Sequence, residues 1–401
     1  MINAAEMILN IERNWNLTVW ELTGPESGWR AQLDALYRAH PVFAIVSGLG
    51  DGSWAPVQAL CDRERMPCWF PSVRLPPEPQ SAGGYGLYFH DGVRLEAAVA
   101  AEALERLPQR PARIVQLVGA GAAAQAAAAA FDRDLGATLG RAHDASRQVA
   151  VEADRAAALT GLGAGDALVL WLDGRELGRL AGLPPPPGVH IFLSAVMAGA
   201  DAAALPESWR ARVSLLYPYE LPQRRWQNMA TFEAWLDLHG IERVDEVMQS
   251  EVFFAVNYLQ FTLSEMLDNV YRDLLLERGQ DMLTRHELQR AEEETMLRMQ
   301  GHPPARAVGA ASRPAPGALY GTDPQGPLAQ AHTQPLLERR STTIYPHLGL
   351  AIGQHFASKG AYVVDFATLQ ARTDPGSGAP EWIAPGLVHE DPAPQHTGDT
   401  Q

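Results

Sequence analysis

Residues 113–135 read RIVQLVGAGAAAQAAAAAFDRDL, a short apolar run, a glycine-containing turn and a long alanine-rich run. A short, almost wholly apolar run is typical of a strand buried on both faces, and alanine has the highest helix propensity. The stretch therefore predicts a strand at 113–118 that turns at 119–121 into a helix at 122–135. A strand followed at once by a helix is half of a βαβ unit, the building block of a parallel sheet.

The same alternation continues on both sides of this stretch. Strands are expected at 17–22, 42–47, 68–73, 86–89, 138–142, 166–172, 189–194, 211–217 and 361–366. Helices are expected at 1–15, 28–38, 57–65, 95–107, 175–183, 231–239, 244–278 and 281–300. Strands that alternate with helices of this length indicate βαβ units and parallel sheets, here two in tandem, so the fold class is α/β.

Composition and charge exclude several classes of protein. The chain has 32 Lys and Arg against 47 Asp and Glu, a net charge of −15 at pH 7. This balance argues against nucleic acid or an anionic membrane surface as the main partner, because both require a basic face. Residues 1–15 carry acidic residues and no basic n-region, so we do not interpret them as a signal peptide.

Two further features concern chain order and cysteine chemistry. Residues 301–341 are rich in Pro, Gly and Ala and are expected to form a disordered insertion, with a flexible tail at 391–401. Cys61 and Cys68 are too few for a four-cysteine zinc site. A bridge between them is geometrically possible across a helix-to-strand turn, and two buried thiols are the favoured alternative.

Three loops follow strand ends, where open parallel sheets place their ligands. The first contains Ser47, Gly48, Asp51 and Ser53 and precedes a helix. Its glycines let a ligand approach the backbone, and free N–H groups at the helix start suit a carboxylate. The alternative is a tight turn in which Ser53 caps the helix.

The second loop, 119–124, fits Gly-x-Gly-x-x-Ala, a dinucleotide fingerprint, with Asp144 where a ribose-binding acid would lie. A NAD-dependent oxidoreductase built on 113–144 is therefore one alternative, and a plain turn that faces a cleft is the favoured one. The third group ends two adjacent strands and comprises Leu172, Asp173, Ser194 and Ala195. Asp173 there either balances a ligand ammonium or caps the following helix.

Catalytic and metal-binding motifs are scarce. The sequence holds no phosphate-binding P-loop, no zinc-protease His-Glu-x-x-His and no Gly-x-Ser-x-Gly, and its 12 histidines do not cluster at ligand spacing. We therefore expect a protein that is not an enzyme, with no metal site and no cofactor.

A series of segments resembles a known family. Residues 37–53, 65–73 and 88–92, then 113–118, 130–137 and 166–174, and finally 217–222, the helix around Tyr258 and 356–366 follow its order of elements. The chain is similar to type I periplasmic binding proteins of the branched-chain amino acid (leucine-binding) kind, the substrate-binding subunits of ABC transporters. The resemblance implies two α/β lobes, each a mostly parallel sheet flanked by helices, joined by three crossovers.

The resemblance also implies a division of the chain, a location and a site. Lobe one would comprise 1–90 and 217–300, and lobe two 91–216 and 342–390. The protein would capture a small polar or anionic metabolite in an interlobe cleft, act in the periplasm and partner an ABC transporter membrane component. The residues that match the family's cleft loops are Ser47, Gly48, Ser53, Ser72, Val73, Gly121, Ala122, Leu172, Asp173, Ser194 and Ala195.

The chain departs from the family at Gly121 and Ala122, where the family often has a tyrosine. This departure leaves open a further alternative, a degenerate binding domain that serves as a protein–protein adaptor, with a cytochrome-linked protein as a possible partner class. The resemblance to similar sequences also implies a subgroup that is associated with oxidative, cytochrome-linked pathways and not with amino-acid uptake.

Overall fold

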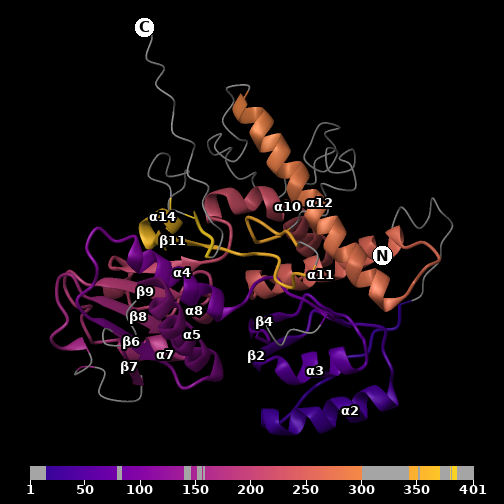
Figure 1. The fold of residues 1–401 in the computed structure, drawn as a ribbon, viewed down its shortest axis with the longest axis horizontal. Helices are drawn as coiled ribbons and strands as arrows, with labels where there is room; N and C mark the ends of the chain where they lie inside the picture. Colours follow the sequence, from indigo (N-terminus) through magenta and orange to yellow (C-terminus); the bar gives the residue numbers. More distant parts are fainter. Residues whose placement is uncertain are drawn as a thin grey trace.

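The structure, a computed structural model, describes residues 15–78, 84–139, 146–150, 156, 159–299, 343–350, 353–370, 380 and 382–385. Asp144, the insertion 301–341, the tail 391–401 and all but the last residue of the expected helix 1–15 lie outside these residues. The described chain forms two lobes (Figure 1) and passes between them three times. The predicted α/β fold, with mostly parallel sheets in two lobes, is confirmed.

The second lobe is built on a seven-stranded sheet in the order β12-β11-β10-β9-β8-β6-β7. The strands from β10 to β7 are parallel, whereas β11 and β12 join the β10 edge in antiparallel orientation. Both β6 and β8 are buried along their whole length, as their apolar sequences predict. The bounds are β6 (Ile114–Val118), β7 (Ser146–Ala150), β8 (Ala167–Trp171), β9 (His190–Ser194), β10 (Val213–Tyr217), β11 (Ala361–Asp365) and β12 (Trp382–Ile383).

Helices cover both faces of this sheet, because alternate residues of a strand point to opposite faces. Val169 and Leu216 pack on one face against α4 and α5, while Leu170 and Leu215 pack on the other among the shorter helices. The helices of this lobe are α4 (Val93–Glu105), α5 (Ala122–Leu139), α7 (Gly174–Leu177), η2 (Gly178–Leu180), α8 (Ala195–Ala198), α9 (Glu207–Arg210) and α14 (Phe366–Gln370).

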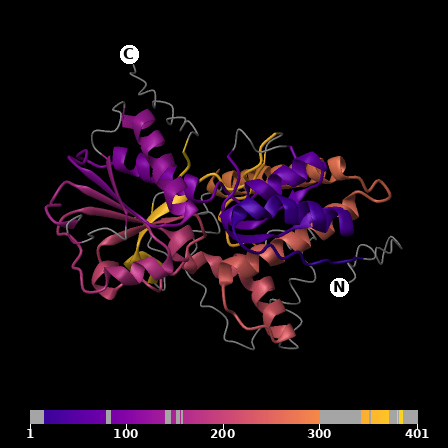
Figure 2. The same cartoon turned by 90° about the horizontal axis from the view of Figure 1, so that it is seen from below.

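The first lobe holds shorter parallel strands. β1 (Ile45–Val46), β3 (Cys68–Trp69) and β5 (Gly86–Leu87) form one sheet, and β2 (Leu49–Ser53) pairs with β4 (Ser72–Leu75) in another. η1 (Glu26–Gly28), α2 (Trp29–Ala39) and α3 (Ala55–Arg63) complete the amino-terminal part, and Figure 2 shows α2 and α3 on the face of this lobe nearest the viewer.

Three long helices complete the molecule: α10 (Pro222–His239), α11 (Glu246–Glu265) and α12 (Arg272–Met299). α11 packs on the first lobe, where the indole N–H of Trp69 donates to the Ala255 carbonyl at 3.0 Å. Asp245 caps α11 by accepting from the Met248 N–H at 2.9 Å. Over the described ranges, no helix combines the length and apolarity that a membrane span requires.

The three passages between the lobes run next to one another. The Tyr88 N–H donates to the His355 carbonyl at 2.8 Å, the Ser358 N–H to the Phe89 carbonyl at 2.6 Å, and the Glu220 N–H to the Ile344 carbonyl at 2.7 Å. We call residues 88–90, 219–220, 344–345 and 355–358 the crossover seam. The lobe division predicted from the sequence gave all of 342–390 to lobe two. Here residues 344–345 and 355–358 lie in the seam, and the chain joins the second-lobe sheet from β11 onward.

Several local predictions were wrong. Residues 17–22 form no strand, and the side chains of Leu17 and Val19 face solvent with 89% and 75% exposure. The expected turn at 47–53 contains β2, because a parallel partner, β4, lies alongside it. Residues 138–139 end α5 instead of starting a strand. The expected helix 244–278 is two helices, interrupted around Leu267, whose φ is +49°.

Cys61 and Cys68 form a disulfide, so the favoured expectation of two buried thiols was wrong. The Cα atoms are 6.0 Å apart, within the range that a disulfide spans. The bond ties α3 to β3, and both cysteines are completely buried. Both residues belong to the small apolar cluster of the first lobe, together with Leu33, Val57 and Met66.

We expect replacement of both cysteines by alanine to lower the free energy of unfolding by about 2 kcal/mol, because the bond constrains the unfolded chain. Urea unfolding of the wild type and of the Cys61→Ala/Cys68→Ala variant measures the difference. A thiol reductant should destabilise the wild type and leave the double variant unchanged. Equal stability of oxidised wild type and double variant would contradict this role of the bond.

Candidate functional site

The two lobes meet where helices of the second lobe lie against β2 and β4. α5 of the second lobe packs against β2 and β4, and α4 also contacts β4. The predicted residues Ser72 and Val73 lie in β4, and Ser194 ends β9 just before Ala195. The structure therefore brings the loops of both lobes to one region, which we call the lobe junction.

On the second-lobe side, the junction is organised around a buried acid, Glu96 in the first turn of α4. Its carboxylate accepts hydrogen bonds from the Ser194 hydroxyl and, at 2.9 Å, from the Val196 N–H. Burial raises the pKa of Glu96 to about 8, and these hydrogen bonds offset only part of that rise. A carboxyl group of the chain itself thus occupies the loop after β9, one of the loops predicted to receive a ligand.

A second buried acid, Glu251 of α11, lies on the first-lobe side. It accepts a hydrogen bond from the Tyr345 hydroxyl and is hydrogen-bonded to the Ser72 side chain. Burial raises its pKa to about 7, although both hydrogen bonds oppose the rise. Ser72, like Ser194, is therefore engaged by a carboxyl group of this chain.

Two tyrosines of the crossover seam lie between these acids. The rings of Tyr219 and Tyr345 are 5.7 Å apart, and the pKa of each is raised well above its ordinary value, first by burial and next by the charge of Glu251. The Tyr345 ring also stacks on Phe89 at 5.4 Å. We call Glu96, Glu251, Tyr219 and Tyr345 the junction cluster, which links both lobes through the seam.

The first predicted loop is largely occupied by its own residues. The Trp54 ring covers Gly48, where an added Cβ would lie 2.2 Å from the ring. Asp51 is 88% exposed and lies 3.5 Å from Arg74, and the Ser53 hydroxyl accepts from the Ala55 N–H at the start of α3. The Ser47 hydroxyl differs, because it is buried and has no hydrogen-bond partner among the described residues.

The loops at the ends of β6 and β8 are also closed by side chains. The Ala120 N–H donates to the Glu176 carboxylate at 2.8 Å, and a Cβ added at Gly119 would lie 2.1 Å from that carboxylate. Gly121 has open space around it at the start of α5. The Glu176 carboxyl group thus occupies the position where a dinucleotide-binding site would hold a phosphate.

Asp173 caps α7 by accepting from the Arg175 and Glu176 N–H groups, both at 2.8 Å. Of its two predicted roles, the structure therefore favours the cap. Leu172 is completely buried in the core, and Ala122 begins α5.

The sequence analysis missed the acids that organise these loops, Glu96, Glu176 and Glu251. Glu96 and Glu251 carry a signal in the sequence, because each is an acidic residue among apolar residues of a helix. Glu96 interrupts the buried face of α4, and Glu251 interrupts that of α11. A buried carboxyl group needs hydrogen-bond donors, so such an interruption predicts a polar partner from a distant part of the chain.

We expect the stability to fall as pH rises, because the folded state holds a proton on Glu96 that the unfolded chain has released. The contribution of this proton is present in full below about pH 4.5 and is lost as pH rises through about 8. The Glu96→Gln variant keeps the acceptor oxygen and has no proton to lose. It should exceed the wild type by about 2 kcal/mol at pH 9 and lose that advantage at pH 5.

Urea unfolding between pH 5 and pH 9 measures this difference. Glu105→Gln, at an exposed position of the same helix, is the control and should follow the wild type. Glu251 remains in all three proteins, so its titration cancels in the comparison. Parallel pH profiles for Glu96→Gln and the wild type would refute a buried, protonated Glu96.

No family model and no curated protein matches this chain. Among solved structures, a putative branched-chain amino acid ABC transporter from Rhodospirillum rubrum is similar, with 13% identity, 71% of this chain and 78% of that chain covered, and a TM-score of 0.46. A second protein described in the same way, from Silicibacter pomeroyi, has 11% identity, with 63% of this chain and 68% of that chain covered and a TM-score of 0.48. A possible leucine/isoleucine/valine-binding protein from Rhodopirellula baltica has 12% identity, with 63% of this chain and 70% of that chain covered and a TM-score of 0.48. These are structures of the kind that the sequence resembles, and similarities this low leave the ligand of this chain unaddressed.

Proposed function

We propose that this protein is a solute-binding protein of the ABC-transporter type, which captures a small polar or anionic metabolite between its lobes. The crossover seam carries the proposal. Three chain passages bonded side by side join the lobes, and each lobe keeps sheets of its own. Such a connection is the geometry on which two lobes open and close around a ligand.

The proposed ligand lies at the lobe junction, with its anionic end toward the first lobe. The free hydroxyl of Ser47 and the backbone at Gly48 are the groups that suit an anion there. Hydrogen-bond donors of the ligand face the opposite wall, where Glu96 and Ser194 accept them on opening. The remaining predicted residues, Asp51, Ser53, Ser72, Val73, Gly121, Ala122, Leu172, Asp173 and Ala195, line or shape this junction in the proposal.

The periplasm is the proposed location, and an ABC transporter membrane component is the proposed partner. The Cys61–Cys68 bond supports this location, because disulfides persist mainly in oxidising compartments such as the bacterial periplasm. No observation on the described residues bears on a cytochrome-linked partner, which stays a prediction.

A second candidate function, the protein–protein adaptor, is favoured by the internal occupation of the binding loops. Trp54 covers Gly48, Glu176 binds the Ala120 N–H and Glu96 binds Ser194. A protein that never opens has no need of vacant ligand groups. The NAD-dependent alternative is disfavoured by the same contacts, since Glu176 would repel a pyrophosphate at the 119–121 turn.

The test is a panel of amino acids, amides, short alcohols and organic acids, followed by melting temperature and by small-angle scattering. One chemical class should raise the melting temperature by several degrees and change the radius of gyration as the lobes rearrange around the ligand. No response across the panel would count against solute binding and in favour of the adaptor.

Ser47→Ala is the sharpest variant for this site. Its hydroxyl has no partner in the free protein, so its removal should leave the stability of the free protein unchanged while weakening ligand affinity by about 5- to 10-fold. Ser27→Ala, at an exposed position of the same lobe, is the matched control and should bind normally. Normal affinity in Ser47→Ala would exclude this hydroxyl from the site.

A further inference from the structure

A hollow of about 320 Å³ lies in the second lobe, at the ends of β9 and β10 remote from the lobe junction. It is bounded by the carboxyl-terminal part of α4 and the segment that follows it, with Ala103 and Leu107, and by the sheet. β9 runs from His190 at the hollow to Ser194 at the junction, a distance of about 13 Å for four residues of strand. The hollow and the junction are therefore separate places.

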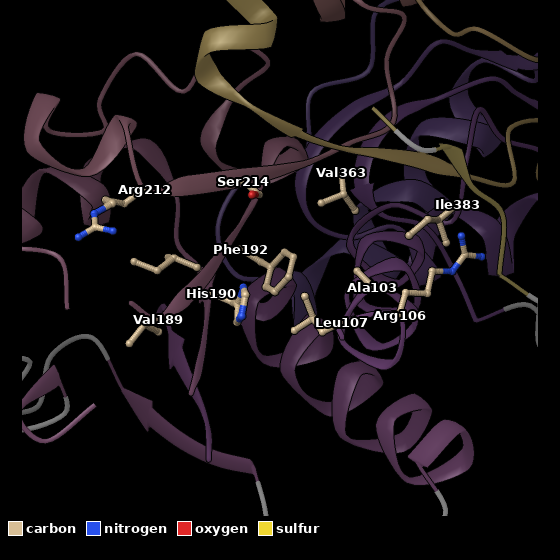
Figure 3. Close-up of a pocket in the computed structure, with 11 residues that line it drawn as sticks. Ala103, Arg106, Leu107, Val189, His190, Phe192, Arg212, Ser214, Val363 and Ile383 are labelled. Atoms are coloured by element: carbon tan, nitrogen blue, oxygen red, sulfur yellow. The ribbon is translucent and has the colours of Figure 1, made fainter. Parts of the chain in front are cut away.

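The floor of the hollow is apolar and the mouth is basic. Phe192, Val363 and Ile383 contribute apolar side chains from three strands. Arg212 and His190 lie at the amino ends of neighbouring strands. Figure 3 shows Arg212 at one end of the lining and His190 nearer its middle, beside the Phe192 ring. Among the described residues that line the hollow, none is acidic, although the whole chain carries a net charge of −15.

The Arg212 and His190 side chains are not neutralised by other residues that the structure describes. No described residue forms an ion pair with the Arg212 guanidinium, and none is hydrogen-bonded to the His190 imidazole. Arg106, at the other end in Figure 3, differs because it pairs with Glu102 one turn earlier in α4. An anionic group is therefore expected at the Arg212 end. Arginine is the side chain best suited to a carboxylate, since its planar fork donates two parallel hydrogen bonds.

We propose that this hollow is a second ligand site, which binds a short-chain monocarboxylate with an apolar tail. The carboxylate lies against Arg212 and His190, with the Ser214 hydroxyl within the lining as a further donor. The tail lies on Phe192, Leu107 and Val363. A volume of about 320 Å³ is at the lower end for small-molecule sites, so the ligand has roughly six to ten non-hydrogen atoms.

Calorimetric titration of the full chain with hexanoate tests the site, with hexanol and hexylamine as the neutral and cationic analogues. Hexanoate should bind with a Kd of about 0.1–1 mM, as expected for a ligand of this size. Hexanol should bind at least about 5-fold more weakly and hexylamine should give no heat, because only the carboxylate engages Arg212. Equal binding of hexanoate and hexanol would overturn the role assigned to the basic end.

Variants locate the binding. Arg212→Gln and His190→Gln, both at exposed positions, should each weaken hexanoate binding by about 5- to 10-fold. Ala103→Phe should abolish it by filling the hollow. Arg30→Gln, an exposed arginine of α2, is the matched control and should bind as the wild type does.

The junction variant Ser47→Ala separates this site from the proposed solute site. Hexanoate binding should be unaffected by Ser47→Ala and reduced by Arg212→Gln. The opposite pattern would place the carboxylate at the junction and overturn the second site. Binding unchanged in Arg212→Gln and His190→Gln would overturn it equally, and these surface changes keep the test valid even where Ala103→Phe does not fold.

Discussion

The crossover seam is the constraint on which the rest of the structure depends. The chain passes between the lobes three times, and each passage must satisfy its backbone groups within one narrow strip. It does so by bonding the passages to one another, as the Tyr88, Ser358 and Glu220 N–H groups show. Tyr345 packs against Phe89 and Tyr219 within the strip and hydrogen-bonds to Glu251 on the first-lobe side. The junction cluster is therefore placed by the topology of the chain.

Two buried carboxyl groups lie beside this strip, and their ionisation is unfavourable while the junction is closed. Removing a carboxylate from water is unfavourable unless it is paired or protonated, and the described partners of Glu96 and Glu251 are hydroxyl and N–H groups. Raised pKa values follow from that environment. In the proposed function, separation of the lobes exposes these groups, so the closed junction and a ligand compete for the same donors.

The predicted strands were confirmed where burial alone determines the conformation of the chain. Residues 114–118, 167–171, 190–194 and 213–217 are strands because apolar runs of that length are stable on both faces only inside a parallel sheet. The positions of the loops that follow the strand ends were predicted, but the residues that these loops contact were not. Ser72 and Ser194 lie at the junction as expected, yet their partners come from Glu251 and Glu96, which are 179 and 98 residues away along the chain.

Sequence by itself determined the class of fold, the central strands of the second lobe, and the loops that follow the strand ends. These depend on local periodicity and on the turn chemistry of glycine and proline. Only the tertiary structure decided that Trp54 covers Gly48, that Cys61 bonds to Cys68, and that internal carboxylates engage the loop donors. Such contacts join residues that no local pattern relates, because they depend on how the two lobes pack once the three passages are in place.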